Sequence, residues 1–353
     1  MGVLIIGAGN GGLAFGAKLL EKGVVVNLYD KYKKVILPIQ QNENKITLIK
    51  DGKKRKDYKF NLVTSNLRKA VNGMKYIFIV VPAFAHKAIA YELVKYVSAN
   101  QIIVLHPGRT GGALEFNSVF SKRMKSNIIA ETETLLYACR KSNQTEINIY
   151  GVKQSVGIST IPQKASQEVT NQINQLLPYF HNSKTFISTS LSNIGAIFHP
   201  VPFLFNLPRV ENKERFKFYH EGITPSIANL LESLDEERVN IGQSFGVNLR
   251  SARQWLNENY NVNGSSLYES IQLNKSYSDI FAPTEIYSRY VMEDIPMSII
   301  PMKEIAKITN LKTPIMDSII NLATNLYKID FKSKARTIES MGLKEHLETP
   351  LRK

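Results

Sequence analysis

The sequence has a single cysteine, Cys139, among its 353 residues. One cysteine cannot form a disulfide within the chain, and it cannot supply a cysteine-rich zinc site. Four scattered histidines show no metal-ligand spacing either: His106, His181, His220 and His346. We therefore expect a protein of the reducing cytoplasm that binds no metal.

Long apolar runs are also missing. No segment approaches the roughly 20 apolar residues that a membrane-spanning helix needs. The chain starts Met-Gly-Val-Leu-Ile-Ile-Gly, with no basic stretch before these residues, so the pattern of a secretory signal peptide is absent. We expect neither membrane insertion nor secretion, and the sequence has no internal repeat or low-complexity segment.

Acidic residues are outnumbered, 30 against 45 basic ones, which gives a formal net charge of +15. Nucleic-acid binding could account for this charge, but the lysines are scattered along the chain. The densest basic run, Lys53-Lys54-Arg55-Lys56, follows Asp51-Gly52, which favours a solvated hairpin. The charge could instead attract anionic small molecules. We expect no nucleic-acid partner.

The first thirty residues follow a strand–turn–helix–strand pattern. Residues 3–6 are an apolar β-type run, residues 13–22 are amphipathic, and residues 24–29 form a second buried-type strand. Further apolar strands are predicted at 76–81 and 102–105, as in a parallel sheet covered on both faces. The pattern predicts an α/β dinucleotide-binding (Rossmann) domain.

The pattern changes near residue 190. We expect the last strands at 158–161 and 185–188, and helices beyond them. Thr224-Pro225 is a helix start, and Ser266 to Glu269 has the spacing of a capping box. We predict a Rossmann domain at 1–190 and an all-helical domain at 191–353.

The turn after the first strand carries the fingerprint GxGxxG. Gly7 permits the tight turn, Gly9 lets the backbone approach a pyrophosphate, and Gly12 lets helix and strand pack closely. Asn10 opens the helix, whose N-terminus favours phosphate. Asp30 follows Gly7 by 30 − 7 = 23 positions and could bind a ribose diol.

This acid favours NAD over NADP, because it would repel a 2′-phosphate. The preference is open to question, since Lys31, Lys33 and Lys34 could pair with such a phosphate. Pro82, at the carboxyl edge of the expected sheet, is assigned to the cofactor site. His86 could line the same cleft or be structural.

Longer motifs resemble the octopine/opine dehydrogenase family. They lie along nearly the whole chain, at residues 81–86, 107–116, 130–140, 193–200, 219–226 and 288–296. The resemblance implies a Rossmann domain followed by an all-α domain like the C-terminal domain of 6-phosphogluconate dehydrogenase. It also implies reductive condensation of an amino acid with a 2-oxo acid, often pyruvate, and a homodimer. His106 departs from the asparagine more common in the family.

The resemblance assigns a histidine–aspartate dyad to His199 and Asp294, and it assigns a substrate-carboxylate clamp to Arg289. The chemistry agrees, because condensation needs a proton relay near neutral pH, an orienting carboxylate and a bidentate cation. Asn193 could contact the substrate or the nicotinamide amide, or it could be a helix N-cap. The sequence indicates no particular role for residues 131–140.

Proline positions put a condition on this site. Arg289 and Asp294 would diverge by about 140° on one continuous helix, at ~3.6 residues per turn. We expect Pro296 to disfavour helical geometry at residue 295, and we expect a broken helix just after His199, where Pro200 follows.

Plainer interpretations remain open. His199 could be a core residue, and Arg289 with Asp294 could be a surface ion pair. Among functions, the alternatives are a carbonyl-reducing dehydrogenase of the ketopantoate reductase or glycerol-3-phosphate dehydrogenase type, and a non-enzymatic NAD-binding or nucleic-acid-binding protein.

Overall fold

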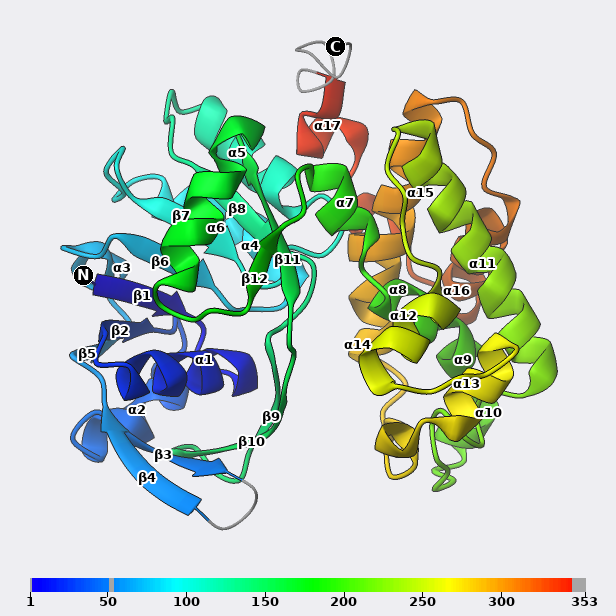
Figure 1. The fold of residues 1–353 in the computed structure, drawn as a ribbon, viewed down its shortest axis with the longest axis horizontal. Helices are drawn as coiled ribbons and strands as arrows, with labels where there is room; N and C mark the ends of the chain where they lie inside the picture. The colour runs from blue at the N-terminus through cyan, green and yellow to red at the C-terminus, as the bar shows by residue number, and fades with distance from the viewer. Residues whose placement is uncertain (1, 51–53, 345–353) are drawn as a thin grey trace. The chain divides into compact units, whose positions relative to one another are not determined.

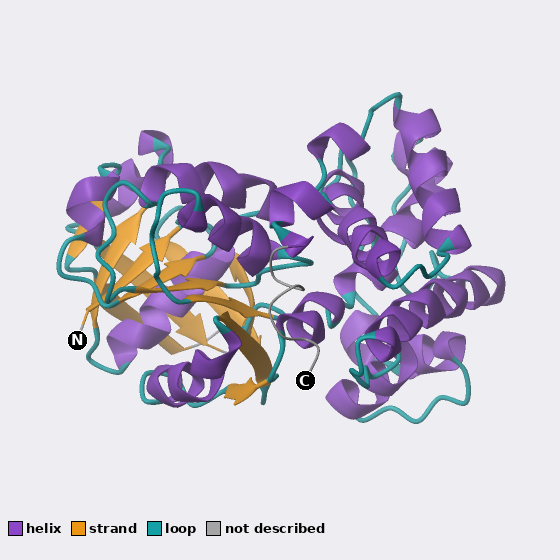
Figure 2. Ribbon diagram, turned by 90° about the horizontal axis from the view of Figure 1, so that it is seen from above, coloured by secondary structure: helices purple, strands orange, loops and turns teal. Residues whose placement is uncertain are grey.

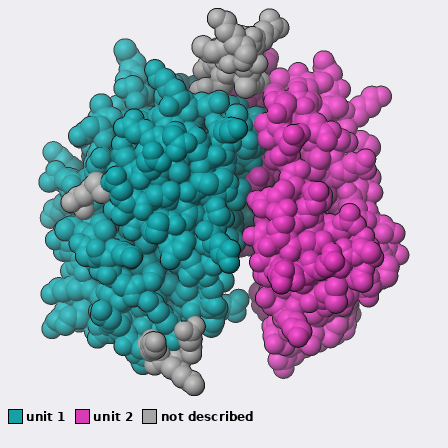
Figure 3. Space-filling view, in the orientation of Figure 1, with its two compact units in different colours: residues 1–189 teal, residues 190–353 magenta. Residues whose placement is uncertain are grey.

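The computed structural model describes residues 2–50 and 54–344. The chain divides into two compact units, residues 1–189 and residues 190–353 (Figure 3).

The first unit is built on an eight-stranded sheet with the order β12-β11-β8-β7-β6-β1-β2-β5. All neighbouring strands are parallel except β8 and β11, and β5-β2-β1-β6-β7-β8 is the order of a Rossmann fold. Every residue of β6, β7 and β8 is buried, as in a sheet covered on both faces. The strands are β1 Gly2–Ile6, β2 Val25–Tyr29, β5 Leu62–Thr64, β6 Tyr76–Ile79, β7 Ile102–Leu105, β8 Ile129–Thr132, β11 Val156–Ile161 and β12 Phe180–Asn182.

Helices precede or follow these strands along the chain (Figures 1 and 2). They are α1 Asn10–Glu21, α2 Lys33–Gln41, α3 Leu67–Val71, α4 His86–Leu93, α5 Gly112–Ser121, α6 Ser166–Asn174 and α7 Phe186–Leu191, with 3₁₀ turns η1 Ala83–Ala85 and η2 Gln163–Ala165. The prediction of a strand at 185–188 is wrong, because α7 begins at Phe186. Thr185 Oγ1 accepts a hydrogen bond from the Ser188 backbone N–H at 3.1 Å, as a helix-capping residue does.

A second sheet of four strands also belongs to this unit, in the order β4-β3-β10-β9. Strands β3 (Lys45–Lys50) and β4 (Lys54–Lys59) are antiparallel, as the expected hairpin requires, while its turn at Asp51, Gly52 and Lys53 lies outside the described residues. Strands β9 (Tyr137–Lys141) and β10 (Glu146–Val152) were not predicted. Helix α1 packs between the two sheets and contacts strands of both (Figure 1).

The described residues of the second unit form helices joined by loops, apart from one isolated bridge between Lys217 and Phe281. The helices are α8 Gly195–Phe198, α9 Pro200–Phe205, α10 Leu207–Glu211, α11 Pro225–Ser244, α12 Ala252–Tyr260, α13 Leu267–Leu273, α14 Arg289–Met292, α15 Ile300–Ile308, α16 Pro314–Tyr327 and α17 Ile338–Met341. Shorter turns are η3 Lys275–Tyr277, the π-helical η4 Ile295–Ile299 and η5 Lys332–Lys334. The expectation of a Rossmann domain followed by an all-α domain is confirmed.

Caps place two of these helices where the sequence predicts them. The Thr224 side chain caps α11, and Ser266 Oγ caps α13 through the Glu269 backbone N–H. The Glu269 carboxylate bonds the neighbouring Ser265 instead of Ser266, so the expected capping box is only half formed. Among the described residues, no helix is both long enough and apolar enough to span a membrane.

A buried ion pair organises the core of this unit. Arg238 Nε donates to Asp235 Oδ1 at 2.8 Å, and both residues lie on α11. The remaining donors of Arg238 reach the carbonyl oxygens of Leu191 and Arg250, while Asp235 Oδ2 accepts the Ala252 N–H at the start of α12. These hydrogen bonds compensate both charges for the loss of water.

Candidate functional site

The glycine turn lies between β1 and α1. Gly7 has φ +111°, and a Cβ on it would lie 2.3 Å from the Val80 carbonyl oxygen. A Cβ on Gly12 would lie 1.8 Å from the Gly7 carbonyl oxygen, so a side chain would push α1 away from the turn. A Cβ on Gly9 would meet nothing within 4 Å. The turn is therefore closed toward the sheet and open beside Gly9, where a pyrophosphate could approach the backbone.

Asp30 lies directly after β2 and braces this turn. Its Oδ2 accepts the Ala8 N–H at 3.0 Å, and its Oδ1 accepts the Tyr32 N–H at 2.9 Å. A carboxylate has about four acceptor positions, so both oxygens can still accept from a ribose diol. Asp30 thus has a structural task in addition to the ribose contact expected from the sequence.

A cavity of about 470 Å³ adjoins Gly7 and Asp30 at the carboxyl ends of β1, β2 and β6. Pro82, Phe84 and Ile89 contribute apolar walls. An apolar slot beside a carboxylate suits an adenosine, and this edge of the sheet is where open α/β folds bind nucleotides. His86 is fully buried at the start of α4 and is not among the residues that line this cavity.

The described residues thus fit a dinucleotide. Gly7 and Gly12 allow the close packing of the turn against β6 and α1, and Gly9 leaves open space where a pyrophosphate could approach the backbone, while Asp30 and Pro82 border the cavity that suits an adenosine. Among the described residues, no group of three or more His, Cys, Asp or Glu side chains could hold a metal ion.

Lys141, the last residue of β9, lies at the glycine turn between β1 and α1. The sequence motifs did not indicate this residue. Its backbone N–H donates to Asn10 Oδ1 at 3.0 Å, and its Nζ lies 3.4 Å from the Ala8 carbonyl oxygen. Burial lowers the pKa of Lys141, and the opposing effect of the Asp30 carboxylate is too small to reverse this shift. The family motif at 130–140 ends one residue earlier, so only the pairing of the strands could have indicated this position.

Residues of that motif shape the loops after β7 and β8. Glu131 is fully buried; its Oε2 accepts the Ala113 N–H at the start of α5, and a Cβ on Gly108 would lie 2.4 Å from the same oxygen. Burial raises the pKa of the Cys139 thiol to about 11, which argues against a nucleophilic role.

His106 is a neutral structural residue. Burial, assisted by the positive charge of Lys153, lowers the pKa of its imidazole to about 3. Its Nε2 accepts the Leu136 N–H at 3.2 Å, so Nδ1 carries the proton and donates to Thr132 Oγ1 at 2.8 Å. At this departure from asparagine, the chain thus has a neutral imidazole that bonds Thr132 and the Leu136 backbone inside this unit.

The second unit brings His199 and Asp294 together. Their Nδ1 and Oδ2 atoms lie 2.8 Å apart, with 21% of the histidine side chain and 2% of the aspartate side chain exposed. His199 lies at the break between α8 and α9, where the proline pattern predicts it. The Tyr290 ring stacks on the imidazole, with centroids 4.3 Å apart and planes 10° apart. The carboxylate holds Nδ1, which leaves Nε2 to exchange a proton with a ligand.

Asn193 supports this dyad through Ser298. Asn193 Nδ2 donates to Ser298 Oγ at 2.7 Å, and Ser298 Oγ lies 3.4 Å from Asp294 Oδ1. The N-cap position of α8 is held by Ile194 and not by Asn193, so the N-cap interpretation is wrong.

Arg289 pairs with a different acid from the one considered in the sequence. Its Nε donates to Glu293 Oε2 at 2.6 Å; its side chain is 63% exposed, whereas Glu293 is 2% exposed. The expected loss of helical geometry at Ile295 is also wrong, since η4 runs through Ile295 and Pro296 as a π-helix. Pro296 stands in the first turn of η4, where a missing N–H is tolerated.

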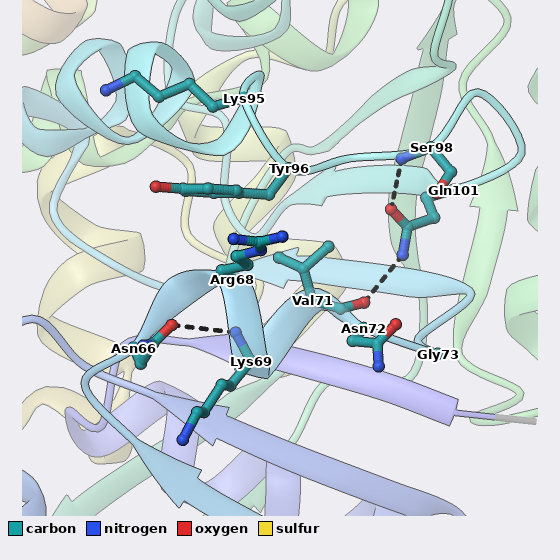
Figure 4. Close-up of a pocket in the computed structure, with 10 residues that line it drawn as sticks. All are labelled: Asn66, Arg68, Lys69, Val71, Asn72, Gly73, Lys95, Tyr96, Ser98 and Gln101. Carbon is teal, nitrogen blue, oxygen red and sulfur yellow. Dashed lines mark hydrogen bonds between the residues drawn. The ribbon is translucent and has the colours of Figure 1, made fainter.

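A larger cavity, of about 940 Å³, lies on the first unit, away from the glycine turn between β1 and α1 (Figure 4). Gly73 and Gln101, which border it, precede β6 and β7, so it lies at the amino ends of these strands. Arg68, Lys69 and Lys95 contribute positive charge. Its position at the opposite edge of the sheet separates it from the nucleotide site.

Comparison with known proteins identifies the family. Residues 182–327 match the NAD/NADP octopine/nopaline dehydrogenase, alpha-helical domain, and residues 2–131 match the NAD-dependent glycerol-3-phosphate dehydrogenase N-terminus. An opine dehydrogenase of Arthrobacter sp. (strain 1C) is 34% identical over 341 residues, which cover 96% of this chain and 94% of the relative.

Solved structures share the fold. Octopine dehydrogenase with NADH and L-arginine has a TM-score of 0.82 at 21% identity and covers 97% of this chain and 96% of its own. Yersinopine dehydrogenase with NADP⁺ bound has a TM-score of 0.78 at 14% identity, with coverage of 97% and 94%. Since the Arthrobacter relative is matched over almost its full length, this protein belongs to the opine dehydrogenase family of NAD(P)-dependent oxidoreductases.

Proposed function

We propose that this protein condenses the amino group of an amino acid with a 2-oxo acid, pyruvate in the first instance, and reduces the resulting imine to a secondary amine dicarboxylate. The observation that carries the proposal is the His199–Asp294 pair, with a 2.8 Å contact, a buried carboxylate and a partly exposed imidazole. Bound NADH supplies the reducing hydride. The protein's own side chains manage protons and carboxylates.

His199 is the proton relay. Imine formation expels the carbonyl oxygen as water, so a proton must reach that oxygen, and an imidazole can deliver it near neutral pH. The Asp294 carboxylate fixes the ring tautomer and stabilises the imidazolium. The Tyr290 ring restricts rotation of the imidazole by stacking on it.

Arg289 binds a substrate carboxylate. Its guanidinium carries five N–H donors, so the contact with Glu293 leaves donors for a bidentate carboxylate. The buried Glu293 carboxylate orients the guanidinium from one side. Asn193 is a positioning residue for the dyad through Ser298, and its contact with the substrate stays a prediction.

NADH is the preferred cofactor. The Asp30 carboxylate would repel a 2′-phosphate, and its two backbone hydrogen bonds keep it at the end of β2. Lys31, one of the cations that could favour NADPH, has its Nζ 4.7 Å from the Tyr32 ring centroid. This arrangement supports a preference for NADH over NADPH.

A cytoplasmic homodimer completes the proposal. A chain with one cysteine is suited to a reducing compartment. In the second unit, Leu322 and Leu326 are 38% and 49% exposed one turn apart on α16, which supports a subunit contact there. Light scattering coupled to size-exclusion chromatography measures the assembly state.

A crossed substrate screen tests the reaction. NADH oxidation is followed with each common amino acid, alone and with pyruvate or another 2-oxo acid, and each active pair is repeated with NADPH. We expect turnover only when both substrates are present, and a secondary amine product in mass spectrometry. Turnover with the 2-oxo acid alone would instead identify a carbonyl-reducing dehydrogenase, and NADH binding without any turnover would indicate a sensor. As a control, His199→Ala should bind NADH and fail to turn over.

A further inference from the structure

Lys141 brings a positive charge from the second sheet to the glycine turn. Its Nζ lies 3.4 Å from the Ala8 carbonyl oxygen and 3.1 Å from Gln144 Oε1. An ammonium has three N–H donors, and these two contacts are the hydrogen bonds of its Nζ within the described part of the chain. A third donor can therefore meet an incoming oxygen.

The strand fixes where this ammonium lies. Lys141 pairs with Ile147 of β10, β10 pairs with β3, and β9 packs against α1. The Asn10 side chain accepts the Lys141 backbone N–H at 3.0 Å and so ties the end of β9 to the first residue of α1. A cation held by rigid elements loses little conformational freedom when it binds a ligand.

A pyrophosphate bound at the glycine turn would be stabilised by a nearby cation. A pyrophosphate carries two negative charges, and the first turn of α1 contains no acidic side chain. The fingerprint supplies backbone N–H groups and the helix dipole, which together amount to a partial positive charge. Lys141 adds a full one next to Ala8, and Ala8 directly precedes Gly9, the residue with open space beside it.

We infer that Lys141 binds the pyrophosphate of the dinucleotide and is a cofactor-binding residue outside the glycine fingerprint. The inference rests on the proposed use of NADH and is independent of which amino acid and 2-oxo acid react. It assigns a function to the second sheet, namely to deliver one cation to the phosphates.

Calorimetric titration of Lys141→Met and Lys141→Arg tests this assignment. The ligands are NADH, ADP-ribose, ADP and adenosine, all without substrates. We expect Lys141→Met to raise the Kd of the three phosphate-containing ligands by about 10-fold, the worth of one charge-assisted hydrogen bond, and to leave adenosine unchanged. Lys141→Arg should stay within about 3-fold of the wild type, because it keeps the charge and the donors.

The matched control is Lys59→Met, which removes an exposed lysine from β4 of the same sheet. It should leave all four Kd values unchanged. Equal ADP affinity in the wild type and Lys141→Met would overturn the inference. Weakening of adenosine by the same factor as ADP would also overturn it, since that result would show a structural role. Substrates are absent from these titrations, so a wrong substrate assignment would leave their outcome intact.

Discussion

At the scale of single residues, the imidazole of His199 is held from two directions. Asp294 binds its Nδ1, and the Tyr290 ring stacks on its face. A ring restrained in this way can present Nε2 in one direction without losing rotational entropy at each turnover.

Replacing Asp294 with Asn tests this restraint. The variant removes the charge that stabilises the imidazolium and permits the wrong tautomer. We expect kcat to fall by roughly 10²–10⁴-fold, as in other His–Asp pairs, with the Kd for NADH unchanged. Steady-state kinetics measures kcat, and calorimetry measures the Kd for NADH. The control is Asp279→Asn, which replaces an exposed aspartate of the same unit. A kcat of Asp294→Asn close to that of the wild type would show that the dyad takes no part in the mechanism.

The sequence identified the members of this dyad but not the residues around it. His199, Asp294 and Arg289 were assigned from motifs, and the proline after His199 indicated the helix break. The partner of Arg289 was missed although the spacing indicates it, because Glu293 follows Arg289 by four positions and therefore lies on the same helix face. The bond from Asn193 to Ser298 joins residues 105 positions apart, which no local pattern reports.

At the scale of elements, Glu21 joins α1 to the second sheet. It receives hydrogen bonds from Lys50 of β3 at 2.6 Å and Tyr58 of β4 at 3.0 Å, and it also pairs with Lys18. Burial alone would raise the pKa of this carboxyl. The hydrogen bonds outweigh burial and lower that pKa to about 2.

Glu21→Gln should therefore destabilise the protein in a pH-dependent way. The native pKa lies below the ordinary value of 4.5, so the stabilisation is fully present above pH 4.5 and is lost as the pH falls toward 2. We expect a loss on the order of 2 kcal/mol in the free energy of unfolding at pH 7, and a smaller loss at pH 3. Urea unfolding at both pH values measures this loss, with Glu236→Gln, which removes an exposed glutamate of α11, as a control. An equal loss at the two pH values would contradict the electrostatic origin.

Elements whose partners are local were predicted best. The caps of α11 and α13 depend on neighbours within a few residues, and the strands and helix of the βαβ unit follow one another within the first thirty residues. The second sheet was missed beyond its hairpin, because β10 pairs with β3 about 100 residues earlier in the chain. Helix α7 was taken for a strand because residues 185–188 are a short run with β-branched and aromatic side chains, and such a run also occurs in short helices.

At the scale of the whole molecule, the net charge of +15 affects how the anionic cofactor arrives. A positive field raises the association rate of an anion and is screened by salt, since the Debye length falls from roughly 10 Å at 0.1 M to 3 Å at 1 M. We expect the association rate of NADH to fall several-fold between low and high salt. Stopped-flow fluorescence measures this rate, and reduced nicotinamide riboside, which carries no phosphate, is the uncharged comparison. A rate independent of salt would show that the charge serves another purpose.

The separation of two ion pairs in the helical unit has an evolutionary consequence. Arg289 rests on Glu293, His199 rests on Asp294, and the two pairs share no atom even though their acids are adjacent in the chain. Under the roles proposed for Arg289 and His199, mutations around Glu293 would alter which carboxylate is recognised and would leave the acid–base pair in place. On that proposal, new substrate specificities could diverge within a lineage while the reaction itself is kept.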